Sequence, residues 1–74
     1  MAAFQILRID LIDRSKVDRT IINTCDSNID QDVTIRVLDI AYPNRKWNGY
    51  LQQNNDTFIY TNGSYMYYVW LQWM

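Results

Sequence analysis

The sequence predicts an all-β fold, namely a small antiparallel β-sandwich or open barrel of five to six short strands that ends in an aromatic β-hairpin. Two runs of β-forming residues flank Asn62-Gly63 near the C-terminus, apolar and polar residues alternate in several earlier segments, and no segment has a convincing helical pattern. The gaps between segments are shorter than the dozen or so residues that a parallel crossover needs, so we expect antiparallel pairing.

The first half of the chain contains three strand candidates. Residues 5–13 alternate, with Leu7, Ile9 and Leu11 on one side, and the charged residues 13–16 then break the pattern. Residues 18–25 form a weaker candidate, for which a helix is the alternative, although the β-branched residues at 20–24 favour a strand. After a polar loop at residues 26–32, residues 33–41 make the clearest strand of this half, because Val33 and Ile35 alternate with polar neighbours.

The second half begins at Pro43, which cannot donate a hydrogen bond within a central strand. Residues 46–53 form a short strand candidate with a bulge predicted at Gly49. In the terminal hairpin, Asn62 and Gly63 favour a type I′ turn that places Tyr60 opposite Tyr65.

Both faces of this hairpin are expected to be apolar. One face carries Phe58, Tyr60, Tyr65, Tyr67, Val69, Leu71 and Trp73, and the other carries Ile59, Met66, Tyr68 and Trp70. A strand that is apolar on both sides needs cover on both sides, and a small chain covers only one side easily. We therefore expect another protein surface to supply the second cover.

The size of the chain supports the same expectation. Its 74 residues, 49% of them hydrophobic, form a single domain over residues 1–74. A domain of this size buries only roughly 60% of its unfolded surface, so oligomerisation is a common source of added stability. The single cysteine, Cys25, excludes an internal disulfide, and we expect it to be a small buried residue in a reducing compartment, with an intermolecular link as the alternative.

The charge balance argues against nucleic-acid binding. Seven basic and eight acidic residues leave a net charge of −1, which provides neither a positive field for nucleic acid nor the dense negative surface of a DNA mimic. Charges at Arg8, Asp10 and Asp13 interrupt the apolar N-terminal stretch, so it is predicted to be neither a signal peptide nor a membrane span. The protein is therefore expected to be cytosolic when it is made.

The residue inventory argues against catalysis. The chain contains no histidine and only one cysteine, so the usual zinc sites and nucleophilic triads are excluded, and we predict no enzyme activity, cofactor or metal. The loop of residues 26–32 begins like a calcium loop, but Gln31 and Val37 occupy the positions of its glycine and its closing glutamate. The loop is therefore interpreted as a solvated turn in which Asp side chains bind nearby backbone N–H groups.

The glycosylation motifs and the tryptophans are interpreted as structural features. Asn55 and Asn62 match the glycosylation pattern, but both are interpreted as turn residues. Trp47, Trp70 and Trp73, together with tyrosines and amides, could form a sugar-binding platform, although sheet core or subunit interface is the preferred reading.

Residues 4–44 resemble the N-terminal β-domain of phage baseplate upper proteins. The similarity lies in the opening segment 6–11, the segment 20–23 with the following Asp26-Ser27-Asn28, and the segment 33–39. It covers a little over half of the chain, and residues 45–74 do not follow the family pattern. The resemblance implies a virion component that attaches to its neighbours through a β-domain, and it therefore places the protein in the host cytoplasm or in the virion. No individual functional residue carries over.

The functional prediction is a non-enzymatic phage or virus-like structural or assembly protein, present as a homo-oligomer or in a larger assembly. The hairpin supplies the predicted protein interface: Tyr65, Tyr67, Tyr68, Trp70, Trp73 and Met74. The alternatives are a small phage-encoded inhibitor that binds a host enzyme or defence complex and, third, a carbohydrate-binding module.

Overall fold

A computed structural model describes residues 1–53 and 56–73, apart from the side chains of residues 50–53. The strands are β1 (Ala2–Asp10), β2 (Val17–Thr24), β3 (Asn48–Gln53), β4 (Thr57–Asn62) and β5 (Tyr65–Trp73), and the helix is α1 (Gln31–Ala41). The five strands form one antiparallel sheet in the order β2-β1-β5-β4-β3. The predicted small β fold, its antiparallel pairing and the strand alternative for residues 18–25 are confirmed.

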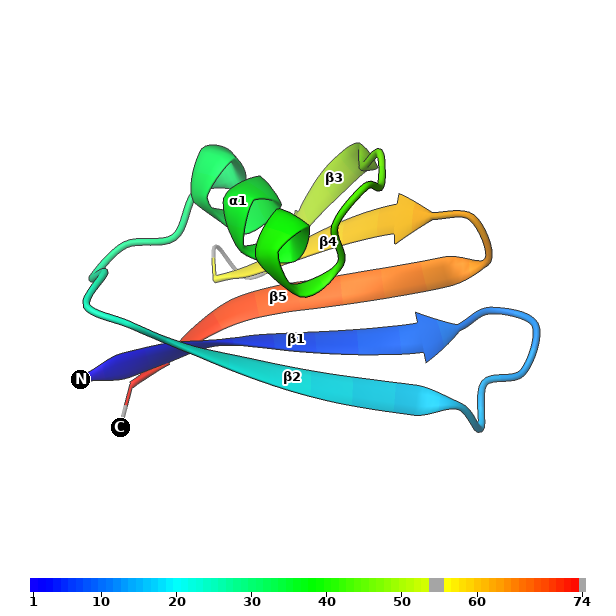
Figure 1. Cartoon of the computed structure of the whole chain (residues 1–74), viewed down its shortest axis with the longest axis horizontal. Coiled ribbons are helices and arrows are strands. Elements are labelled where there is room, and N and C mark those ends of the chain that lie inside the picture. Colours follow the sequence, from blue (N-terminus) through cyan, green and yellow to red (C-terminus); the bar gives the residue numbers. More distant parts are fainter. Residues whose placement is uncertain (54–55, 74) are drawn as a thin grey trace.

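The sheet is not closed, and its second layer is a helix rather than a second sheet. Figure 1 shows α1 lying across one face of the sheet, with β2 and β3 at the two edges. The first and last strands are neighbours in the middle of the sheet, with Ala2 opposite Trp73, so the two ends of the chain lie together. One face of the sheet therefore has cover from the chain itself.

The prediction of a strand over residues 33–41 is wrong, because this segment lies within α1. Asp30 caps the helix, and its carboxylate accepts a hydrogen bond of 2.9 Å from the Val33 backbone N–H. The buried residues Thr34, Val37 and Leu38 share one face of a helix, whereas a strand would divide them between two faces. Burial of this helical face outweighs the preference of the β-branched residues for a strand.

The C-terminal hairpin is confirmed, but its register differs from the predicted one. Asn62 pairs with Tyr65 and Tyr60 pairs with Tyr67, so Gly63 and Ser64 form the turn. Gly63 has a φ of 61°, and a positive φ at the first turn residue alone is typical of a type II′ turn rather than type I′. The difference amounts to two residues along β5, and an even shift keeps each side chain on its predicted face.

The smaller features of the sheet follow the sequence. The register of β3 shifts between Asn48 and Leu51, and Gly49 has a φ of 54°, as expected for the predicted bulge. In the turn between β1 and β2, the Asp10 carboxylate accepts hydrogen bonds from the backbone of Ile12 and Asp13. Aspartate side chains thus stabilise this turn by binding backbone N–H groups.

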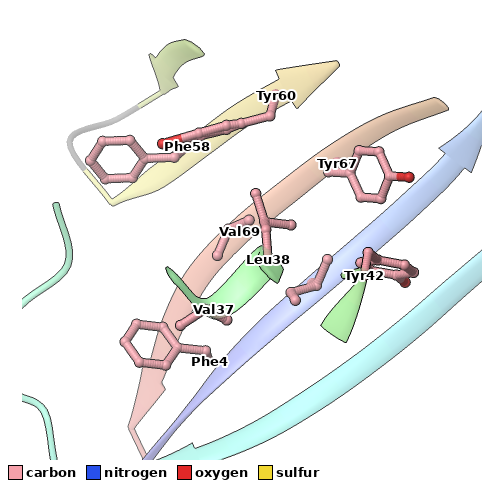
Figure 2. Packing of buried hydrophobic residues seen from close by; sticks show 9 residues of the cluster. Phe4, Val37, Leu38, Tyr42, Phe58, Tyr60, Tyr67 and Val69 are labelled. Carbon is pink, nitrogen blue, oxygen red and sulfur yellow. The ribbon is translucent and has the colours of Figure 1, made fainter. Parts of the chain in front are cut away.

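The hydrophobic core lies between α1 and the sheet (Figure 2). Its buried members are Phe4, Ile6, Val37, Leu38, Tyr42, Phe58, Tyr60, Tyr67 and Val69. The Tyr60 hydroxyl forms a hydrogen bond with the hydroxyl of Thr34, which satisfies both polar groups within the core. The core thereby joins the helix to three strands, β1, β4 and β5.

Candidate protein-binding face

Alternation along the strands gives the sheet two faces in different surroundings. In β5, Tyr67 and Val69 are fully buried beneath the helix, whereas Tyr68 and Trp70 point to the opposite side and are only half-buried. We call the side opposite α1 the open face. Its described side chains are Ala3, Gln5, Leu7 and Ile9 of β1, Val17, Arg19, Ile21 and Asn23 of β2, Thr57, Ile59 and Thr61 of β4, and Met66, Tyr68, Trp70 and Gln72 of β5.

The pairing register arranges the apolar side chains of the open face in rows across the strands. Leu7 lies opposite Tyr68, which in turn lies opposite Ile59. The neighbouring row brings Ile9 opposite Met66. Opposed side chains in an antiparallel pair are about 5 Å apart at Cβ, so members of a row contact one another. The open face therefore has a continuous apolar centre.

Trp70 extends this centre along β5 toward the end where the termini lie. It pairs with Gln5 on one side and with Thr57 on the other, so its indole is flanked by polar side chains. Farther out, Val17 and Ile21 on the edge strand are 49% and 58% exposed. The apolar surface thus reaches the sheet edge formed by β2.

No element in the described part of the chain covers the open face, since α1 lies on the other side. Four strands spaced about 4.8 Å apart, each roughly 25 Å long here, make a face of roughly 500 Å². Part of this area is polar. The largest apolar patch on a typical soluble monomer is roughly 300–600 Å² and is often functional, so the apolar centre of the open face is a candidate binding site.

The open face carries almost no charge. Arg19 is its only charged residue among the described side chains, and it lies on the edge strand opposite Leu7. The centres of protein interfaces are depleted in charged residues and enriched in aromatic residues and methionine, as this face is. Its composition fits contact with protein better than contact with a polar ligand.

The structure divides the predicted interface residues among three environments. Tyr68 and Trp70 lie on the open face, whereas Tyr67 lies wholly inside the core with 0% exposure. Tyr65 and Trp73 belong to the helix side of the sheet, at opposite ends of β5. The last predicted residue, Met74, lies outside the described residues. The candidate protein-binding surface is therefore the open face, to which the hairpin contributes only some of its residues.

Sequence reasoning missed the part of the open face that lies outside the aromatic hairpin. Leu7 and Ile9 come from β1 and Ile21 comes from β2, far from the hairpin in sequence. The signal that could have found the β1 residues was present, because alternation in residues 5–13 already placed them on one side. What was missing was the knowledge that β1 is the neighbour of β5.

A second constellation lies on the helix side, around Arg8. Its guanidinium forms an ion pair with Asp18 and stacks over the rings of Tyr42 and Tyr65, at 5.0 and 4.6 Å from their centroids. Burial lowers the pKa of Arg8, but the hydrogen bond to Asp18 and the neighbouring tyrosines outweigh this effect and raise the pKa overall. The group thus remains a fixed cation that holds β1, β2 and β5 together at this end.

A depression of about 310 Å³ adjoins this constellation. Arg8 and Lys16 line it together with Asp10 and Asp18, so charges of both signs alternate around the opening. Because Arg8 is already paired with Asp18, the depression presents no uncompensated charge from that residue. It does not resemble a site for a charged ligand.

The expected burial of Cys25 is wrong, since this cysteine is exposed. It follows the last residue of β2, where the chain leaves the sheet, so neither layer covers it. Within the described residues, no group of three metal-ligating side chains occurs. No helix in the described part of the chain has the length and apolarity that a membrane crossing requires.

The three tryptophans do not share one surface. Trp70 and Trp73 are an odd number of residues apart on β5 and point to opposite faces. The Trp47 ring lies on the helix side, 4.8 Å from the Tyr67 ring, and its N–H donates a 2.9 Å hydrogen bond to Asp39. The fold therefore does not assemble the three-indole platform considered for sugar binding.

Comparisons with protein families, with curated proteins and with solved structures found no match to this chain.

Proposed function

We propose that this chain is a non-enzymatic assembly protein that binds other protein subunits through the open face of its sheet. The observation that supports this proposal is the continuous apolar centre around Tyr68 and Trp70, which no described element covers. Large aromatic side chains that become desolvated at the centre of a contact contribute most of the binding energy in protein interfaces. The proposed partners are copies of this chain and neighbouring subunits of a phage or virus-like particle.

The virion part of the proposal rests on the resemblance of residues 4–44 to the baseplate β-domain. Two of the segments that carry this resemblance lie on β1 and β2, and the third, residues 33–39, is helical in this chain. The two segments in the sheet thus support the attachment role that the resemblance implies. The third segment differs, because it belongs to the helix that covers the sheet and not to a strand.

The open face is suited to binding because its side chains are already ordered. Tyr68 and Trp70 project from the central part of a sheet, with paired strands on both sides. A rigid strand and a side chain with two rotatable bonds lose little conformational entropy when a partner covers them. Two faces of roughly 500 Å² would together bury roughly 1,000 Å², which is near the lower limit for a specific interface.

The placement of the aspartates supports a non-enzymatic role. Asp10 and Asp13 bind backbone N–H groups in the β1–β2 turn, and Asp30 caps α1. Asp18 pairs with Arg8, and Asp39 accepts from an indole N–H. Each of these carboxylates has a structural partner, including Asp10 and Asp18, which both line the depression beside Arg8 but are engaged by the turn backbone and by the Arg8 guanidinium.

Light scattering on the purified chain tests the proposal. We expect the protein to form assemblies whose mass falls in a variant that carries both Tyr68→Ser and Trp70→Ser, because these changes remove the apolar centre. Trp73→Ser is the matched control, since this exposed indole lies on the same strand but on the other side. Thermal unfolding of each variant checks that the domain still folds.

An assembly mass that is unchanged by the double variant would contradict the proposal that the open face is the contact. A chain that is monomeric in every variant would instead favour the inhibitor predicted as the alternative, whose apolar face stays free until its target is present.

A further inference from the structure

The two edges of the sheet differ in how well they are protected. β3 is six residues long, and the register shift between Asn48 and Leu51 disrupts it. β2 is eight residues long, contains neither glycine nor proline, and pairs with β1 without a register shift. Natural sheets protect their edges with bulges, prolines, charged side chains or very short strands. Of these features β2 has only two charged residues, Arg19 and Asp18, and Asp18 is paired with Arg8, so this edge is the less protected of the two. Figure 1 shows β2 along a free edge of the sheet.

The backbone hydrogen bonds next to β2 show which of its groups point outward. The Asp10 N–H donates to the Lys16 carbonyl at 3.1 Å, and the next N–H, that of Leu11, donates in the other direction, to the Ser64 carbonyl at 2.7 Å. Antiparallel ladders alternate in this way along each strand. Even-numbered residues of β2 such as Thr20 therefore bond to β1, and odd-numbered residues direct their N–H and C=O groups away from the sheet.

The outward-pointing residues are Val17, Arg19, Ile21 and Asn23, which thus present a row of backbone donors and acceptors at the edge. We propose that β2 pairs antiparallel with β2 of a second copy of this chain, so that two five-stranded sheets join into one continuous sheet. The inference deepens the proposed assembly function and rests on it.

Charge determines the register of this pairing. When two copies of β2 pair about a two-fold axis, opposed side chains must point to the same face of the joined sheet. This requires one residue of β2 to lie opposite the same residue of the second copy, and we describe the axis as lying at that residue. An axis at Asp18 or at Arg19 would place like charges opposite each other, and an axis at Ile22 would pair only residues 20–24 of each strand, because β2 ends at Thr24. Like charges directly opposite one another destabilise a sheet. The remaining axes within the middle of β2 pass through Thr20 or Ile21.

An axis at Ile21 gives the better match. It places Ile21 opposite its own copy, Arg19 opposite Asn23 and Thr20 opposite Ile22, so the guanidinium lies beside an amide. An axis at Thr20 would place Arg19 opposite Ile21 and Asp18 opposite Ile22, so neither charge would have a polar side chain opposite it in the second copy. Both registers align outward backbone groups of the two copies, so the side chains decide between them.

This pairing has a consequence for the open face. A two-fold axis perpendicular to the sheet keeps both helices on the same side, so the two open faces also lie on one side. They meet across Ile21, which belongs to the open face and is 58% exposed. The dimer would thus present one joined open face of about twice the size, roughly 1,000 Å², with an apolar centre from each copy, to the next subunit.

Proline at residue 21 tests the inference by removing the outward N–H. Because this N–H does not bond to β1, Ile21→Pro leaves the internal ladder complete, as edge strands allow. The matched control is Ile21→Thr, which removes apolar surface from the same position but keeps the N–H and the β-branched shape. Both changes are made in the Tyr68→Ser/Trp70→Ser background, so that association through the open face does not contribute.

In that background we expect a concentration-dependent dimer of about 18 kDa, twice the 8.9 kDa of one chain. Ile21→Pro should give the monomer mass at all concentrations, and Ile21→Thr should retain the dimer. Circular dichroism and thermal unfolding confirm that the proline variant is folded. A dimer that survives Ile21→Pro, or a background variant that is monomeric throughout, would overturn the edge pairing. Neither result contradicts the proposed function, which depends on the effect of the open-face changes alone.

Cross-linking provides a second test that does not depend on disrupting the protein. Residues opposite each other in a hydrogen-bonded antiparallel pair have Cα atoms about 5.5 Å apart, which suits a disulfide. In a Cys25→Ser background, Ile21→Cys should therefore form a covalent dimer rapidly on mild oxidation. Ile12→Cys, at a residue that is 84% exposed in the β1–β2 turn, measures chance collisions. Equal rates for the two cysteines would contradict the Ile21 register.

Discussion

Among single residues, Tyr67 shows how a residue with an interface-like sequence context can serve the core instead. Its ring contacts Tyr42 and Trp47 edge-on, with centroids 5.1 and 4.8 Å away. Its hydroxyl is buried without a partner in hydrogen-bonding geometry within the described residues. Burial is the largest influence on this phenol and raises its pKa, and the nearby Arg8 guanidinium partly offsets that effect. The ring stabilises the domain, and we interpret its hydroxyl as an unsatisfied group, because the Arg8 guanidinium is near it but outside hydrogen-bonding geometry.

We predict that Tyr67→Phe is neutral or stabilising by about 1 kcal/mol at neutral pH, since it removes an unsatisfied buried hydroxyl and keeps the ring. The folded state also raises the pKa of this phenol. The contribution of this phenol to the free energy of unfolding is therefore fully present below about pH 10, the ordinary pKa of tyrosine. It is lost as the pH rises through the raised pKa of the folded state. Urea unfolding from pH 8 to 11 should show a smaller alkaline loss for Tyr67→Phe than for the unchanged protein.

The control for this prediction is Tyr68→Phe, which changes a half-buried phenol on the open face. If Tyr67→Phe is destabilising by more than about 1 kcal/mol, its hydroxyl makes a favourable interaction in the fold, and our interpretation of an unsatisfied group is wrong.

Among the elements, α1 decides which face of the sheet stays open. The helix is held at its start by the Asp30 cap and along its length by Val37 and Leu38 in the core. It covers the side of the sheet that carries Phe4 and Tyr60 and leaves the side that carries Trp70. The position of one short helix thus determines which aromatic residues are available to a partner.

We predict that Asp30→Ala destabilises the domain by about 1 kcal/mol, because the Val33 N–H loses its acceptor at the helix start. Chemical denaturation followed by circular dichroism measures this change. Asp26→Ala, at an exposed residue of the same connection, should change stability much less. Equal effects of the two changes would indicate that overall charge, rather than the cap, is responsible.

At the scale of the whole molecule, a single cluster joins the helix layer to the sheet layer, so the domain should unfold as one unit. The free energy of unfolding for 74 residues is expected to be only about 4 to 11 kcal/mol. Loss of one central contact between the layers should therefore remove a large fraction of the free energy of unfolding. Leu38 is such a contact, because it is fully buried between the helix and the sheet.

We predict that Leu38→Ala costs about 2 to 5 kcal/mol through the lost apolar contact and the cavity it leaves. In a domain of this size the midpoint temperature should fall by more than about 10 °C. Ile40→Ala is the matched control, since this residue of the same helix is 65% exposed and should lower the midpoint far less. A similar fall for both variants would contradict the prediction, because it would show that burial of Leu38 in the core is not what distinguishes the two positions.

Local patterns in the sequence were sufficient for several elements of this fold. Asn62-Gly63 between β-forming runs marked the hairpin, and Gly49 marked the bulge. The same patterns were insufficient for residues 33–41, where alternation and helical spacing coexist and only contact with the sheet separates them. The turn also lies one residue later in the chain than predicted, because Gly63 is the first turn residue, with a positive φ, and Asn62 belongs to β4.

By itself, the sequence determined that this protein is a small antiparallel β-domain with an aromatic C-terminal hairpin, and it determined which hairpin side chains share a face. These properties follow from local alternation and turn chemistry, which act within one segment. Only the tertiary structure decided that β1 lies beside β5, that α1 covers one face, and that Leu7, Ile9, Tyr68 and Trp70 form one surface. Such contacts join residues far apart in the chain, and they depend on the free energy of packing whole layers together rather than on any local preference.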